Sequence, residues 1–133
     1  DHASAFGNFA NANGAGASAF GVWSMANGYS ASAFGDGSYA NGAYASTFGV
    51  WSNANGYSAS AFGNFAYANG DYASAFGRGA NAFGASATEI GENANALGSN
   101  ATASGAFATA NGTGKIWRAF LLKFKKTGEN LTG

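Results

Sequence analysis

The sequence lacks cysteine and proline altogether, contains a single histidine, and has few charged residues. Without cysteine there is no disulfide framework and no thiolate metal site. A collagen-like triple helix is excluded too, because it needs glycine at every third residue together with abundant proline. No apolar run approaches the roughly 18 residues of a membrane-spanning helix. The aromatic residues (12 Phe, 6 Tyr and 3 Trp) argue against a disordered linker.

Catalytic and metal-binding sets cannot be assembled from the residues that remain. His2 is the only histidine and lies at the terminus, so no Ser/His/Asp set is available. Paired carboxylates and a phosphate-binding loop are absent as well. Asp36 and Asp71 are isolated, whereas calcium-binding repeat rolls need a recurring aspartate. We therefore predict that the chain is not an enzyme and uses no cofactor or metal ion.

What the chain does contain is a strict repeat. A glycine occupies every multiple of seven from Gly7 to Gly112. The stretch Val50–Gly63 reads VWSNANGYSASAFG, and the same 14 residues occur at Val22–Gly35 with one change, Met25 for Asn53. A repeat of this regularity indicates a solenoid, in which each unit contacts only its neighbours.

Small and large residues alternate within each heptad. Ala59 and Ala61, four and two places before Gly63, are small, whereas Ser60 and Phe62 are larger positions that vary between repeats. Period-two alternation is typical of a β-strand, and its small face predicts a narrow lumen. We predict an all-β solenoid of 14-residue coils, each with two strands of about five residues. About eight coils stacked at about 4.8 Å would form a rod about 40 Å long.

The two strands of a coil differ in the residue before the glycine. In alternate heptads this residue forms what we call the Phe row: Phe6, Phe20, Phe34, Phe48, Phe62, Phe76 and Ile90. In the other heptads it is asparagine, until Phe83 and Leu97 interrupt. A stacked Phe row would expose a larger apolar stripe than soluble monomers usually do. Burying one Phe contributes about 1.5–3 kcal/mol, so we predict that the Phe row forms an oligomer interface.

The motif Ser-Ala-Phe-Gly, two variable residues, then Ala-x-Ala-Asn-Gly resembles the YadA-like head repeat of trimeric autotransporter adhesins. That family's repeats read Ser-Val-Ala-Ile-Gly followed by x-x-Ala-x-Ala-x-Gly, and Ala87–Gly91 comes close to this form. The resemblance covers Asp1 to about Gly112. It implies a left-handed parallel β-roll on a bacterial cell surface, in which three chains meet through the Phe row.

A second aromatic set falls in the turns that follow the glycines. It comprises Phe9, Trp23, Trp51, Phe65 and Phe107 after the Phe row, and Tyr29, Tyr44, Tyr57 and Tyr72 after the asparagines. Aromatic residues bury much area at low entropic cost and are therefore favoured at interfaces. These residues predict either a binding edge (for a host matrix protein, a sugar or a neighbouring filament) or caps that complete the packing of the roll.

Glu89 occupies a position that is otherwise Ala or Thr in the repeat. Because an unpaired carboxylate does not fit an alanine-wide lumen, we expect a bulge, a widened coil or a switch of face at this residue.

The composition changes after residue 114. Residues 1–114 hold one basic and five acidic residues (net −4), and residues 115–133 hold five basic and one acidic (net +4). We predict two parts, a β-roll domain over 1–114 and a basic amphipathic segment over 115–133 that acts as a neck, cap or link between chains. Its spacing fits a coiled coil and a strand about equally well. The apolar residues assigned to linking are Ile116, Trp117, Phe120, Leu121 and Phe124.

Together these features predict an extracellular structural protein of a bacterial surface, which mediates attachment or aggregation as a homo-oligomer. One alternative is a subunit of a self-assembling extracellular filament of stacked solenoids. Another is an ice- or glycan-binding module, although the Phe row shares the face that carries the regular hydroxyls. Nucleic acid is not an expected partner.

We expect that deleting Lys115–Gly133 leaves the β-rich roll folded and shortens or abolishes its assemblies, because the linking aromatic residues are lost. Circular dichroism reports the fold, and light scattering or microscopy reports assembly size. Assemblies of unchanged size would contradict the linking role.

Overall fold

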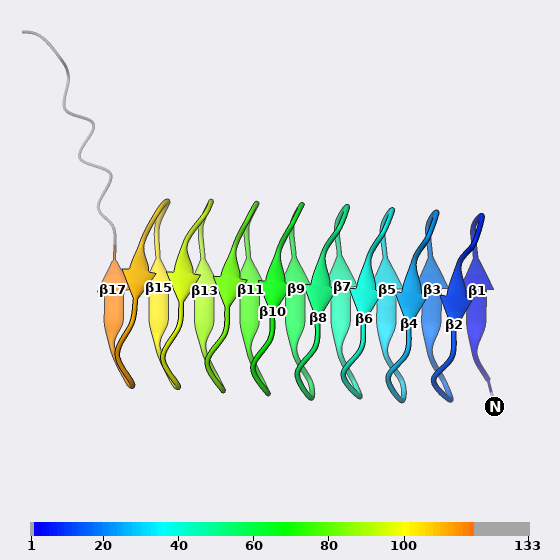
Figure 1. Ribbon diagram of the computed structural model, residues 1–133, viewed down its shortest axis with the longest axis horizontal. Coiled ribbons are helices and arrows are strands. Elements are labelled where there is room, and N and C mark those ends of the chain that lie inside the picture. The colour runs from blue at the N-terminus through cyan, green and yellow to red at the C-terminus, as the bar shows by residue number, and fades with distance from the viewer. Residues whose placement is uncertain (1, 119–133) are drawn as a thin grey trace, which may run out of the picture.

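The computed structural model describes residues 2–118, which wind into a straight solenoid (Figure 1). Every coil contributes one strand to each of two parallel sheets that face each other across a narrow lumen. The turns between the two sheets form the two long edges of the rod. The predicted all-β solenoid with 14-residue coils and about eight turns is confirmed.

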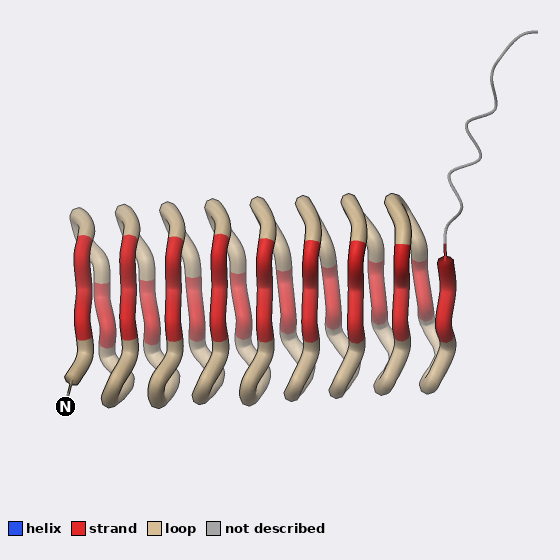
Figure 2. The backbone as a smooth tube through the Cα atoms, turned by 180° about the vertical axis from the view of Figure 1, so that it is seen from behind, coloured by secondary structure: helices blue, strands red, loops and turns tan. Residues whose placement is uncertain are grey.

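Sheet A holds nine strands in the order of the chain and faces the viewer in Figure 2. Its strands are β1 (Ser4–Phe6), β3 (Ser18–Phe20), β5 (Ser32–Phe34), β7 (Ser46–Phe48), β9 (Ser60–Phe62), β11 (Ser74–Phe76), β13 (Thr88–Ile90), β15 (Thr102–Ser104) and β17 (Ile116–Arg118).

Sheet B holds the eight intervening strands, which are shorter. They are β2 (Asn11–Ala12), β4 (Met25–Ala26), β6 (Tyr39–Ala40), β8 (Asn53–Ala54), β10 (Tyr67–Ala68), β12 (Asn81–Ala82), β14 (Asn95–Ala96) and β16 (Thr109–Ala110).

Both sheets pair in one constant register, in which each residue lies beside its equivalent in the next coil. Ser46 pairs with Ser60 and Phe48 with Phe62, and the same offset of 14 holds for every pair of strands. As a result, any residue type that recurs in the sequence becomes a continuous row along the rod.

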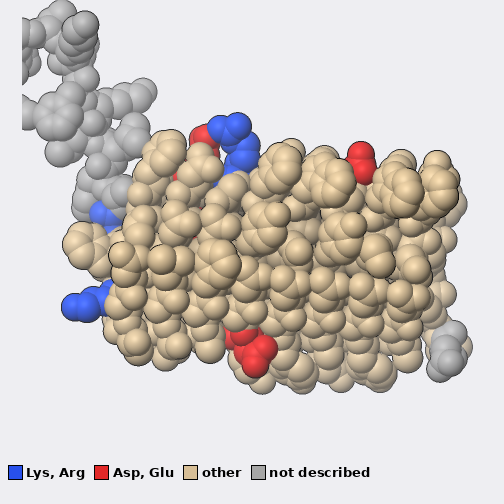
Figure 3. Space-filling model, in the orientation of Figure 1, with Lys and Arg blue, Asp and Glu red and all other residues tan. Residues whose placement is uncertain are grey.

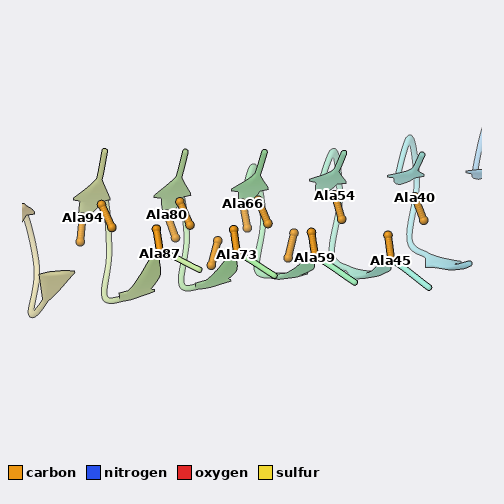
Figure 4. Packing of buried hydrophobic residues seen from close by; sticks show 14 of the residues in the cluster. Ala40, Ala45, Ala54, Ala59, Ala66, Ala73, Ala80, Ala87 and Ala94 are labelled. Carbon is orange, nitrogen blue, oxygen red and sulfur yellow. The ribbon is translucent and has the colours of Figure 1, made fainter. Parts of the chain in front are cut away.

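The lumen is lined almost entirely by alanine methyl groups. Figure 4 shows alanines of the two sheets pointing toward one another, and both Ala54 and Ala61 are completely buried. Ser24, Ser38 and Ser52 also point inward, and each hydroxyl donates a hydrogen bond of 2.9–3.0 Å to the carbonyl of the glycine three residues earlier. These bonds satisfy the buried hydroxyls, so the lumen tolerates serine without an unpaired polar group.

Glycine is required at the two corners of each coil for two different physical reasons. Gly49 adopts a φ of +141°, which L-residues with a side chain avoid, and an added Cβ would also lie 2.4 Å from the Gly63 carbonyl oxygen. Gly42 has an ordinary φ, yet its Cβ would lie only 1.9 Å from the Gly56 carbonyl oxygen. The coils therefore contact one another backbone to backbone at both corners.

The strands are shorter than the roughly five residues expected, because the backbone bends at the corner glycines. Pairing between coils nevertheless continues outside the strands, as in the bond from the Asn41 amide to the Ala54 carbonyl at 2.9 Å.

At the C-terminal end, β17 places Ile116 and Trp117 beside Thr102 and Ala103, so sheet A extends past residue 114. The division at residue 114 and the linking role of 115–133 stay predictions, and Phe120, Leu121 and Phe124 lie outside the described residues. The described part of the chain contains no helix capable of spanning a membrane.

The narrow lumen predicts different effects on stability for the same substitution at two neighbouring residues. We expect Ala61→Leu, which points inward, to destabilise the roll by more than the roughly 1–3 kcal/mol typical of overpacking, because the opposing alanines leave no slack. Ser60→Leu, which points outward from the same strand, should cost less. Thermal melts of the two variants test this, and equal losses would refute the assignment of inward and outward faces.

Candidate functional site

The Phe row lies on the outer face of sheet A, at the last position of each strand. Its central rings are stacked: Phe20, Phe34 and Phe48 have successive centroid separations of 4.9 and 4.8 Å with interplanar angles of 1° and 4°. Phe62 and Phe76 continue the stack at 4.8 and 5.2 Å, while Phe6 is tilted at the end. The rings fill the space along the rod but leave their outer edges in solvent.

The row ends where the repeat loosens. Ile90 of β13 is its last apolar member, and the register places Ser104 and then Arg118 at the next two positions. The Phe-row position on the outer face of sheet A is thus apolar over most of its length and polar near its C-terminal end.

Sheet B presents an amide ladder at the equivalent position. The side-chain nitrogen of each asparagine donates to the carbonyl oxygen of the next one along the rod, over distances of 2.6–2.8 Å. We call this set the Asn row: Asn13, Asn27, Asn41, Asn55 and Asn69. Phe83 and Leu97, which take the next two positions, are both exposed.

The turns that follow the Asn row carry four stacked tyrosines, the Tyr row: Tyr29, Tyr44, Tyr57 and Tyr72. Successive rings pack edge to face, with centroids 5.4–5.5 Å apart and interplanar angles of 66–74°. Each tyrosine remains 43–60% exposed. The sequence predicts aromatic residues in these turns, and the structure brings these four together into one continuous row.

The opposite edge of the rod, after the Phe-row glycines, carries a more broken aromatic set. Phe9 and Trp23 stack at 4.2 Å, but the next turn has Gly37 instead of an aromatic residue. The Trp51 indole lies across Gly37, where an added Cβ would meet ring atoms at 2.7–2.9 Å. Phe65 and Phe107 are exposed on the same edge.

Several of these aromatic residues adopt a left-handed backbone conformation. The second residue of every turn has a positive φ, and Trp51 (56°) and Tyr72 (58°) share it with Gly37 (59°) and Asn93 (53°). Glycine and asparagine suit this conformation, whereas for a bulky residue it costs about 1–2 kcal/mol. The aromatic side chains at this second turn position are therefore kept there against a local backbone preference.

Charges are sparse on the surface, as Figure 3 shows for the face of sheet B. Arg78 and Glu92 form an exposed ion pair between adjacent coils on the Trp-bearing edge. Among residues 2–118, no group of three or more His, Cys, Asp or Glu side chains could hold a metal ion.

A comparison with known protein families matches the YadA head domain repeat to residues 1–22, 26–46, 54–80, 68–88 and 90–114. These segments cover well over half of the chain. The chain belongs to the YadA head repeat family. A search of curated proteins finds no match to it. YadA head repeats form the heads of trimeric autotransporter adhesins, which are homotrimeric proteins of bacterial cell surfaces and act in adhesion. The family is structural and not enzymatic.

One residue of this YadA-type head departs from the pattern of its lumen. Glu89 is completely buried in β13, between Ala75 of β11 and Ala103 of β15, and neither carboxyl oxygen makes a hydrogen bond of ordinary geometry. Burial raises the pKa of Glu89 from an ordinary 4.5 to about 8, an effect that the backbone amide of Phe76 partly opposes. A carboxyl group with a pKa of about 8 is mostly protonated, and so mostly uncharged, at pH 7.

The bulge and the face switch expected at Glu89 are wrong, because Glu89 stays in register and buried in the lumen, whereas a widened coil stays a prediction. Residues 88–90 keep the same register as every other strand of sheet A. The expectation assumed a charged carboxylate, whereas protonation removes most of the desolvation penalty and lets the side chain stay inside the lumen.

We expect the stability of the roll to depend on pH through Glu89. Its native pKa lies above its unfolded value, so its contribution is fully present below about pH 4.5 and is lost as the pH rises through about 8. The free energy of unfolding should fall by up to about 1.4 kcal/mol per pH unit within that window. Urea titrations between pH 5 and 8 measure the slope.

Glu89→Gln should flatten this slope, because the amide does not titrate. Glu92→Gln, which changes an exposed carboxylate on the next turn, is the matched control and should leave the slope intact. An equal slope in the wild-type protein and Glu89→Gln would contradict the assignment.

Proposed function

We propose that this chain is an adhesive head segment whose copies associate through the Phe row and attach to other surfaces through the remaining faces of the rod. The observation that carries the proposal is the Phe row itself, a stack of apolar rings on the outer face of sheet A that no part of residues 2–118 covers.

The geometry of the row suits association with further copies of the same chain. Because the register never shifts, the row is straight, and equivalent rows can meet along their whole length. The serine side chains of the same face, such as Ser32 and Ser46, are small enough to let the backbones of neighbouring rolls approach closely. Burial of the exposed ring edges favours association, since each Phe that becomes fully buried contributes up to about 1.5–3 kcal/mol.

The proposed interface also explains why the two sheets differ. Sheet A carries the apolar row, whereas sheet B carries the amide ladder, whose unused donors and acceptors suit contact with water. In a homotrimer joined through sheet A, sheet B and at least part of the aromatic edges would face outward. We assign attachment to these outward surfaces.

We expect the triple variant Phe34→Ser/Phe48→Ser/Phe62→Ser to sediment as a monomer or to lose its fold, because it removes three adjacent rings from the middle of the stack. Analytical ultracentrifugation of the wild-type chain should give three times the monomer mass. A wild-type chain that remains monomeric would refute the interface, and long fibres in negative stain would favour the filament alternative.

A matched control removes three phenylalanines from a turn edge instead. Phe9, Phe65 and Phe107 occupy the left-handed turn position, which Asn93 also occupies, so their replacement by asparagine suits the backbone. This control should keep the oligomeric state of the wild-type chain. Loss of association in the control as well would show that general loss of aromatic residues, and not the Phe row, is responsible.

A further inference from the structure

We propose that the Tyr row and the adjoining Asn row form a binding surface for a neutral, β-linked polysaccharide that lies along the rod. This inference deepens the proposed adhesive function by naming a class of ligand, and it rests on that function.

The fold does not need the tyrosines. The turn at Gly84 contains Ala85 and Ser86, and it closes with a 3.0 Å hydrogen bond from the Ala87 amide to the Gly84 carbonyl; the turn at Gly42, which contains Tyr44, closes with the same bond at 3.1 Å. The bonds between coils are also equivalent. The Tyr72 amide donates to the preceding coil at 2.7 Å and the Ser86 amide at 2.8 Å. The tyrosines therefore add a surface to turns that form without them.

The sequence also places the four rings in an unusual way. Tyr29 and Tyr57 are the first residues of their turns, whereas Tyr44 and Tyr72 are the second residues and take the left-handed conformation. Serine holds that second position in the intervening turns, at Ser30 and Ser58, without the bulky side chain. Four consecutive coils thus each carry one tyrosine ring. Because the ring comes from the first and the second turn position in alternation, the arrangement of the row repeats every two coils.

This repeat suits an extended β-linked glycan. Coils stacked at the strand spacing advance by about 4.8 Å, which is close to the length of one pyranose ring along such a chain. Neighbouring sugars in a β-1,4-linked chain are turned over relative to each other, so that the chain also repeats every two units. The apolar faces of sugar rings pack against exposed aromatic rings, and each tyrosine is about half exposed.

The Asn row supplies matching polar groups beside the rings. Each interior asparagine, such as Asn41, uses one N–H and one carbonyl lone pair within the ladder, which leaves one N–H and one lone pair over. Within residues 2–118, none of the four tyrosine hydroxyls makes a hydrogen bond to the protein. Sugar hydroxyls both donate and accept, and so they can use both halves of each amide. A proline-rich peptide has few hydrogen-bond donors, so it would use only the free N–H of each asparagine and leave the carbonyl lone pair unused.

Charge narrows the class of ligand further. Within the four tyrosine turns (residues 28–31, 42–45, 56–59 and 70–73) the charged residue is Asp71, whose carboxylate accepts a 2.8 Å hydrogen bond from the Tyr57 amide. Asp36 lies in a turn of the opposite edge. These four turns hold no basic residue, so they do not attract polyanions such as nucleic acids or sulfated glycans. The surface therefore favours an uncharged polysaccharide.

The test uses the full chain and insoluble cellulose and chitin as probes in depletion assays, with amylose as an α-linked control, heparin as a polyanion and poly-L-proline as an extended peptide. The variant Tyr29→Ala/Tyr44→Ser/Tyr57→Ala/Tyr72→Ser replaces each tyrosine by the residue at the same turn position after Gly84, where Ala85 is first and Ser86 is second. We expect the wild-type chain to bind cellulose or chitin, and the variant to bind at least about tenfold more weakly. Replacing the same four tyrosines by phenylalanine should weaken binding less, because the rings remain.

The opposite-edge variant Phe9→Asn/Phe65→Asn/Phe107→Asn is the control for general loss of aromatic surface, and it should lose less binding to cellulose or chitin than the Tyr-row variant. The inference is overturned if neither cellulose nor chitin is bound, if the Tyr-row variant binds them as well as the wild-type chain does, or if heparin or poly-L-proline is bound more tightly. Sedimentation and cell-surface attachment are measured in parallel. A trimer that attaches to surfaces without binding either glycan would overturn this inference alone, whereas a monomeric wild-type chain would overturn the proposed function.

Discussion

The contact between backbones at the corner glycines is the constraint on which the rest of the structure depends. The carbonyl group of the next coil occupies the space that a Cβ would need at Gly42 and at Gly49. This contact holds successive coils at the strand spacing, and the alanine methyl groups set the distance between the two sheets. With both distances fixed, almost no freedom remains inside the roll, and variation in the sequence is confined to the outer positions.

The outer positions therefore form rows, and each row has its own chemistry. The Phe row is apolar and uncovered, the Asn row is a hydrogen-bonded amide ladder, and the Tyr row is aromatic with polar tips. Three different surfaces thus run parallel to one another along one short rod, because the register never shifts. The proposed separation of an interface for further copies from surfaces for attachment follows from the different outer residues of alternate heptads.

The sequence was sufficient to predict the coil length, the alanine lumen and the existence of the Phe row, because a strict period fixes which residues are stacked. The sequence was not sufficient to predict features that depend on local geometry or on the protonation of a side chain. The pattern does not reveal that protonation allows the Glu89 side chain to stay buried in the lumen. The sequence predicts aromatic residues in these turns but not their packing into one row, because successive tyrosines alternate between the first and the second turn position, as Tyr57 and Tyr72 illustrate. The sequence also does not show that glycine is required at the corners for two different reasons, namely a positive φ at Gly49 and the close approach of the next coil alone at Gly42.

Each coil contacts only the coils before and after it, and this has a consequence for how such a head can change over generations. Loss or duplication of 14 residues in phase with the repeat would leave every remaining coil with the same neighbours and the same hydrogen bonds. The near-identical units Val22–Gly35 and Val50–Gly63 are the kind of sequence in which recombination can slip by whole coils. The length of the rod, and with it the number of rungs in each row, is thus the property that can vary most easily without any new packing problem.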